Sequence, residues 1–193
     1  MPERLTPTEL LELTKKHFLD TFAQKEKPIY SYLPQHVHQV ATWAERILTT
    51  QPEANSQVVR LAVWLHDIGH VLGQEDTDHA VKSEVESKRF LTENGLDTKT
   101  IEAVAHCVRA HRNRDIPPST PEAKIIAAAD SASHFTDINY IIHCQEGIKT
   151  YALEKLERDY RDVGLISGLQ EQLTPLYQAW KQLLAVFPET KKD

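Results

Sequence analysis

The dipeptide His66-Asp67 comes directly after the apolar run Leu61-Ala62-Val63-Trp64-Leu65, and this placement limits what the chain can fold into. An imidazole and a carboxylate at the end of a core-type helix cost free energy unless something compensates the charge. The negative end of the helix dipole would add to the cost of an isolated Asp67. A bound divalent cation is one of the few groups that compensates both effects. The dipeptide therefore predicts a metal ion, with further ligands supplied from elsewhere in the chain.

The composition is that of an ordinary globular protein. The chain has 193 residues, of which 40% are hydrophobic and 26% are charged, enough for one domain with a substantial core. The net charge of −6 argues against a protein that coats nucleic acid but allows a local basic pocket. Cys107 and Cys144 are too few for a disulfide framework and suit a reducing compartment. The charged start and the lack of a long apolar stretch predict a soluble cytoplasmic protein without a membrane partner, and they leave its oligomeric state open.

Hydrophobic residues recur at helical spacing along nearly the whole sequence, and no segment alternates at period two. Capping residues, prolines and glycines indicate where the helices begin and end. Thr6 and Ser167 are expected to cap the first and the last of them. The sequence therefore predicts a single all-α domain over residues 1–193, with helices at about 7–23, 34–50, 56–68, 79–94, 98–111, 122–135, 138–144, 147–162 and 168–187.

Helical phase separates the histidines that face the core from those that face solvent. Counting on from His36 in steps of three and four gives the apolar residues Val40, Trp43, Ala44 and Ile47. Counting in the same way from His38 gives the polar residues Thr42, Glu45 and Thr49. His66 shares its face with valines and an alanine, and Asp130 ends the apolar run 125–129. His36, His66-Asp67 and Asp130 therefore form a mixed nitrogen and oxygen ligand set. Such a set suits a catalytic divalent metal with open positions, namely manganese, iron, nickel or zinc, with magnesium also allowed.

The ordered set His36, His66-Asp67 and Asp130, with Val40-Ala41 after the first histidine and Ile68-Gly69 after the pair, resembles the HD-domain metal-dependent phosphohydrolases. The resemblance covers a core of about residues 34–139, and helices 147–187 would complete the bundle. It implies that His36, His66, Asp67 and Asp130 bind the metal, with Asp67 also orienting the attacking water. It further implies hydrolysis of a phosphorylated small molecule, plausibly a nucleotide, by metal-activated water.

Some members of this family use extra histidines to hold a second metal. His111 lies on an apolar helical stripe, and His79 directly precedes a helix with a small, apolar side. Their placement is similar to that of the second-metal positions, although two-metal members often carry paired histidines where this chain has Ala110-His111. His79, His111 and Arg112 are therefore expected to bind either the substrate phosphate or a second metal. The polar segment 112–121, with Arg112 and Arg114, is expected to act as a lid over the pocket.

Three questions stay open at this level. Some family members carry a carboxylate where this chain has His70, so the general acid is unassigned, with Glu75 and Glu84 as the available substitutes. The same scaffold also serves di-iron oxygenases, which need a fuller histidine set than one containing Ala110. A non-catalytic module that binds a ligand or partner is the other alternative, and the intact ligand set argues against it.

Overall fold

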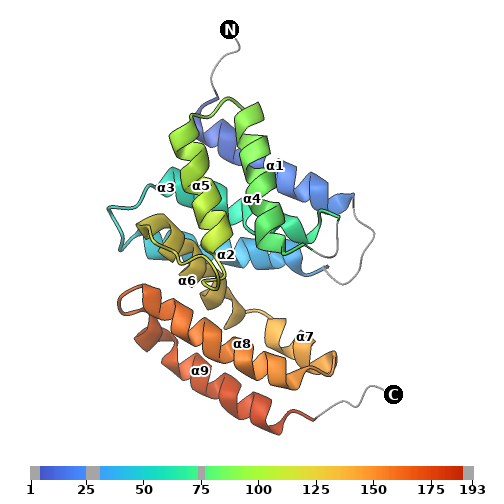
Figure 1. Ribbon diagram of the computed structural model, residues 1–193. Helices are drawn as coiled ribbons and strands as arrows, with labels where there is room; N and C mark the ends of the chain where they lie inside the picture. The colour runs from blue at the N-terminus through green and yellow to red at the C-terminus, as the bar shows by residue number, and fades with distance from the viewer. Residues whose placement is uncertain (1–4, 25–30, 74–76, 189–193) are drawn as a thin grey trace.

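The computed structural model describes residues 5–24, 31–73 and 77–188. Within these ranges every regular element is a helix, which confirms the all-α prediction (Figure 1). In chain order the elements are α1 (Pro7–Ala23), α2 (Leu33–Leu48), α3 (Ser56–Leu65), η2 (Ile68–His70), α4 (His79–Glu93), α5 (Thr98–Ala110), α6 (Pro121–His134), α7 (Asn139–Gln145), α8 (Lys149–Asp162), η3 (Val163–Leu165) and α9 (Leu169–Val186). Among these helices, none combines the length and the apolar character that crossing a bilayer requires.

Helix boundaries follow the local sequence where a capping side chain is present. Thr6 accepts a hydrogen bond from the backbone N–H of Glu9, whose side chain accepts one from the N–H of Thr6. The prediction that Ser167 caps the last helix is wrong, because α9 begins after Gly168, which has a φ of 78°. This left-handed turn at a glycine redirects the chain between η3 and α9, so the residue before it cannot reach the helix end.

Figure 1 shows two groups of helices that meet at α6. Helices α1, α3, α4 and α5 pack together with α2, while α7, α8 and α9 form a second layer on the other side of α6. Helix α6 contacts α2, α3 and α5 in the first group and α8 in the second. Polar side chains at the carboxyl-terminal end of α6 are therefore placed where both groups can reach them.

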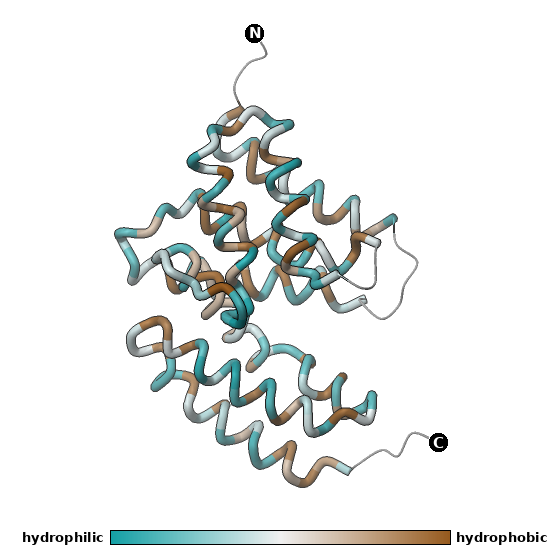
Figure 2. Tube along the Cα trace, in the orientation of Figure 1, coloured by the Kyte–Doolittle hydropathy of each residue, from teal (hydrophilic) through white to brown (hydrophobic). Residues whose placement is uncertain are grey.

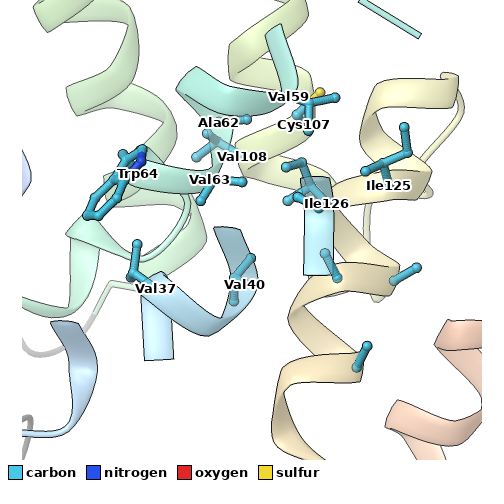
Figure 3. Packing of buried hydrophobic residues seen from close by; sticks show 14 of the residues in the cluster. Val37, Val40, Val59, Ala62, Val63, Trp64, Cys107, Val108, Ile125 and Ile126 are labelled. Atoms are coloured by element: carbon cyan, nitrogen blue, oxygen red, sulfur yellow. The ribbon is translucent and has the colours of Figure 1, made fainter. Parts of the chain in front are cut away.

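The core lies where α2, α3, α5 and α6 face one another. Figure 3 shows Val37 and Val40 of α2 packed close to Val63 of α3 and Ile126 of α6, and all of these side chains are buried. Every residue of α3 from Val58 to Leu65 is buried except Arg60, as expected of a helix that is apolar nearly all round. Figure 2 shows hydrophobic residues gathered where helices meet and hydrophilic residues on their outer turns. This packing holds the inward-facing polar groups of three helices in fixed positions.

The chain leaves α3 earlier than its apolar pattern predicts. His66 is the last residue with helical geometry, and Asp67, with φ −109° and ψ 6°, lies outside the helix before η2. Just beyond this break, Gly69 approaches the first turn of α4 closely. A Cβ atom at Gly69 would lie 2.1 Å from the carbonyl oxygen of His79, and the N–H of Gly69 donates to Ser83 Oγ over 2.8 Å. This contact ties the segment that follows Asp67 to α4.

Candidate metal centre

The four side chains predicted as metal ligands converge at one point between α2, α3 and α6. Nε2 of His36 lies 3.1 Å from Oδ1 of Asp130 and 3.5 Å from Oδ2 of Asp67. Nε2 of His66 lies 3.6 Å from the same oxygen of Asp67 and 3.9 Å from Oδ1 of Asp130. Groups from distant parts of the sequence therefore present two ring nitrogens and two carboxylate oxygens to a common centre.

Hydrogen bonding decides which ring nitrogen of His66 faces this centre. Nδ1 of His66 lies 2.7 Å from the carbonyl oxygen of Val63, and because a carbonyl only accepts, Nδ1 carries the hydrogen and Nε2 carries a lone pair. Burial lowers the pKa of His66, which keeps the ring neutral. Nε2 is buried and has no hydrogen-bond partner among the described residues. A buried lone pair without a donor is costly, and a metal ion is the partner that this donor set fits.

The two carboxylates are ionised. Burial by itself would raise the pKa of Asp67 and of Asp130, but surrounding imidazoles, among them His111 for Asp67 and His134 and His36 for Asp130, hold both pKa values well below the usual range. Burial would lower the pKa of His36, yet its contacts with Asp130 and Asp137 outweigh burial and raise that pKa to about 10. The centre therefore calls for a positive charge, which a proton on His36 or a metal ion supplies.

The other oxygen of Asp67 faces a second group of histidines. Oδ1 lies 3.5 Å from Nε2 of His79, 3.5 Å from Nε2 of His111 and 3.7 Å from Nε2 of His70. The Nε2 atoms of His79 and His111 are 3.3 Å apart. Nδ1 of His111 is 2.7 Å from the carbonyl oxygen of Val108, so Nε2 carries the lone pair when this ring is neutral. Asp67 thus presents one oxygen to each of two histidine groups, an arrangement that suits a shared ligand of two ions.

His134 belongs to the centre although the sequence reasoning did not select it. Nε2 of His134 lies 3.7 Å from Oδ1 of Asp130, and its ring stacks on that of His36 with a centroid separation of 5.0 Å and an interplanar angle of 7°. Together with His36 and Asp130 it forms a possible ligand group. His134 lies one turn after Asp130 on the same face of α6, and this spacing is the signal that could have identified it.

Carboxylates outside the centre contact the far nitrogens of two of these histidines. Asp137 Oδ2 lies 3.3 Å from Nδ1 of His36, and Asp159 Oδ2 lies 3.1 Å from Nδ1 of His134. Such contacts orient a metal-binding imidazole and raise its basicity. Asp137 follows α6 outside any helix, so no helical stripe marks it. Asp159 shares the buried face of α8 with Ala152, Leu156 and Val163, and this spacing could have identified it.

A cavity of about 180 Å³ opens beside both groups. One water molecule needs about 10–15 Å³ on this measure, so the cavity has room for a small-molecule substrate. Arg112 and Arg114 both line it. The guanidinium of Arg112 forms an ion pair with Asp78, whose side chain also accepts a hydrogen bond from the N–H of Ala80 in the first turn of α4. Arg112 is therefore tied to the turn that carries His79.

Segment 112–121 was expected to act as a lid, and Glu75 and Glu84 were the candidates for the general acid. Segment 112–121 contacts α5, because Asp115 pairs with Arg109 and Ser119 Oγ lies 3.0 Å from Nε2 of His106. The role of this segment as a lid stays a prediction. Glu84 pairs with Lys88 at 3.2 Å and with Arg109 at 3.6 Å and is not among the described residues that line the cavity. Glu75 lies outside the described residues.

Residues 34–133 match the family model of the HD domain. No curated protein and no solved structure matches the chain significantly. The matched segment contains the whole set His36, His66-Asp67 and Asp130. The helical fold and the buried histidine and aspartate set, which could hold a metal ion, fit an HD-type helical core. The chain belongs to the HD-domain family, a superfamily of metal-dependent phosphohydrolases.

Proposed function

We propose that this protein hydrolyses the phosphate ester of a small molecule, plausibly a nucleotide, with a divalent metal ion held by His36, His66, Asp67 and Asp130. One observation carries the proposal: the buried, unpartnered Nε2 of His66 faces the same point as two ionised carboxylates. Imidazole ligands favour manganese, iron, nickel or zinc over calcium, and the carboxylates leave magnesium possible.

A divalent ion in this set would supply Lewis acidity to the phosphoryl oxygens and make water more acidic. The protein's own groups then position the reactants. Asp67 stays unprotonated because its pKa is held well below the usual range, so it can accept a hydrogen bond from the attacking water and orient it. His79, His111 and Arg112 line the cavity next to Oδ1 of Asp67 and are proposed to bind the substrate phosphate or a second ion.

The test joins metal analysis with a hydrolysis screen. The purified protein is loaded with each candidate metal and assayed against nucleotides, cyclic nucleotides and sugar phosphates. Asp67→Ala should remove most of the bound metal and all hydrolysis, because both histidine groups lose their shared carboxylate. Asp20→Ala is the control, since Asp20 is an exposed residue of α1 that pairs with Lys16. An Asp67→Ala protein with full metal content and full turnover would show that the site assignment is wrong.

A di-iron oxygenase is the second candidate activity, and one feature of the geometry supports it. Ala110 argues against the fuller histidine set that this activity needs, but His70, His79 and His111 lie around Oδ1 of Asp67. Oxygen consumption by the iron-loaded protein, without phosphate release from any ester, would identify that activity. Metal binding with neither activity would identify a non-catalytic ligand-binding module.

A further inference from the structure

Helix α8 presents a polar stripe to the cavity. Tyr151, Lys155, Arg158 and Asp162 recur at intervals of three and four residues, which places them on one face of the helix, and all of them line the cavity. The C-terminal helices were expected only to complete the bundle, so a charged face turned toward the metal centre needs a separate explanation. Charged side chains at a buried face are costly unless each has a partner.

Most of the charges along this wall do have partners. Lys155 Nζ lies 3.3 Å from Asp159 Oδ1 and 3.0 Å from Nδ1 of His134. Asp162 Oδ1 accepts hydrogen bonds of 2.9 Å from Asn113 and from Arg161. These groups are satisfied by the protein itself.

Two guanidinium groups at the cavity have no strong ion pair with a described residue. The nearest carboxylate to Arg158 is that of Glu154, 3.9 Å away on a side chain that is 64% exposed, so the attraction is weak. Nη2 of Arg158 is buried without a hydrogen-bond partner in the described part of the chain, and its guanidinium lies 5.2 Å from the ring centroid of Tyr151. Arg114 lines the same cavity and forms no hydrogen bond or ion pair with any described residue.

A third polar group at this wall is also unpartnered. Asn139, the first residue of α7, is only 7% exposed and lines the cavity. Its Oδ1 atom is buried and accepts no hydrogen bond from the described residues. An asparagine amide can turn to present either its oxygen or its NH₂ group, so Asn139 can serve a ligand that accepts or donates.

We propose that Arg158, Arg114 and Asn139 form an anion subsite that binds a second phosphate group of the substrate. Guanidinium groups bind phosphate through paired, charge-assisted hydrogen bonds, and a phosphate here satisfies the buried Nη2 of Arg158. This inference rests on the proposed function for the metal end of the cavity, where the scissile phosphate lies. It names the substrate class: small molecules with two or more phosphate groups, such as polyphosphate esters or bisphosphates.

The test measures anion binding directly. The protein as purified is titrated by calorimetry with inorganic phosphate, pyrophosphate and tripolyphosphate at one ionic strength, and its metal content is measured on the same samples. Wild type should bind tripolyphosphate at least about 10-fold more tightly than phosphate, because the longer anion can reach additional guanidinium donors. The double variant Arg158→Gln/Arg114→Gln should lose about 10- to 100-fold in tripolyphosphate affinity at unchanged metal content.

The controls separate a binding role from general charge loss and from misfolding. Arg46→Gln removes an exposed arginine of α2 outside the cavity and should bind tripolyphosphate as wild type does. Arg158→Lys should be intermediate, since it keeps the charge and loses the planar fork. Should the double variant fail to fold, Arg114→Gln alone, at an exposed position, supplies the measurement.

Equal affinities of wild type for the three anions, or tripolyphosphate binding by the double variant equal to that of Arg46→Gln, would overturn the anion subsite. The outcomes also separate the anion subsite from the proposed function. A protein that hydrolyses no ester but loses tripolyphosphate binding in the double variant keeps the subsite and loses the proposed function. A protein that hydrolyses phosphate esters while the double variant binds tripolyphosphate normally keeps the function and loses the subsite.

Discussion

Nε2 of His36 and Oδ1 of Asp130 lie 3.1 Å apart, although the two residues belong to α2 and α6. The apolar contacts between these helices, with Val37 and Val40 on one side and Ile126 on the other, hold the pair in place (Figure 3). The distance therefore reports the packing of the core as well as the chemistry of the site.

His36 and His38 should respond differently to the same substitution. His36→Ala should lower metal affinity by about 10- to 100-fold or more, because His36 is buried in the centre, 4% exposed, against its carboxylates. His38→Ala should leave metal affinity unchanged, since His38 is exposed and its ring makes a T-shaped contact with Trp64. Competition with a chelator measures both. Equal losses from the two variants would show that the helical phase of α2 is wrong.

Gly69→Ala should destabilise the protein and disturb the second histidine group. The added methyl would meet the carbonyl oxygen of His79 at 2.1 Å and Ser83 Oγ at 2.8 Å, and overpacking of this kind costs about 1–3 kcal/mol. Because His79 must move away, the metal or phosphate affinity of its group should also fall. Urea unfolding and metal titration check the two effects.

Gly73→Ala is the matched control for that substitution, because a Cβ there meets nothing within 4 Å. We expect it to change the free energy of unfolding by less than about 0.5 kcal/mol. Comparable destabilisation by the two alanines would contradict the steric role of Gly69.

The effect of Arg112 on substrate binding should depend partly on Asp78. The two side chains form an ion pair, and Asp78 caps α4 beside His79. Arg112→Gln and Asp78→Asn should each raise KM for the phosphorylated substrate, and a double-mutant cycle on unfolding should give a coupling energy of about 0.5–3 kcal/mol. Arg114→Gln combined with Asp78→Asn should show no coupling, since Arg114 has no ion pair with a described residue. Additive Arg112 and Asp78 variants would contradict this role.

Glu86, which lies away from the metal centre, should make the free energy of unfolding depend on pH. Burial would raise its pKa, but hydrogen bonds from His17 and Arg89 lower it from 4.5 to about 2. The pKa of such a carboxylate is lower in the folded protein than in the unfolded chain. Its contribution to stability is complete above the pKa of the unfolded chain and is lost as the pH falls through the pKa of the folded protein. Glu86→Gln should therefore cost about 1–3 kcal/mol near neutral pH, and the difference from wild type should shrink between about pH 4.5 and about pH 2.

Urea unfolding across that pH range measures the effect, with Glu12→Gln as the control, because Glu12 is an exposed residue that pairs with Lys15. A constant difference between wild type and Glu86→Gln at every pH would show that the charge of Glu86 is not the source of its stabilisation.

The helices and the inward direction of His36, His66 and Asp130 could be predicted from the sequence, since helical phase is a local property. Apolar residues spaced three and four positions apart mark the buried face of a helix. A polar group on that face must have a buried partner. The pair His66-Asp67 at the end of such a face was therefore enough to indicate a metal and, with its ordered companions, the family.

Only the tertiary structure decided which histidines meet which oxygen of Asp67, and that α8 contributes charge to the cavity. Asp67 lies outside α3, two residues before Gly69, which packs against the carbonyl oxygen of His79 at the start of α4. His134 and Arg158 gain their roles from the packing of α8 against α6. The physical reason is that the cost of a buried charge depends on neighbours brought together by long-range packing, which no local periodicity records.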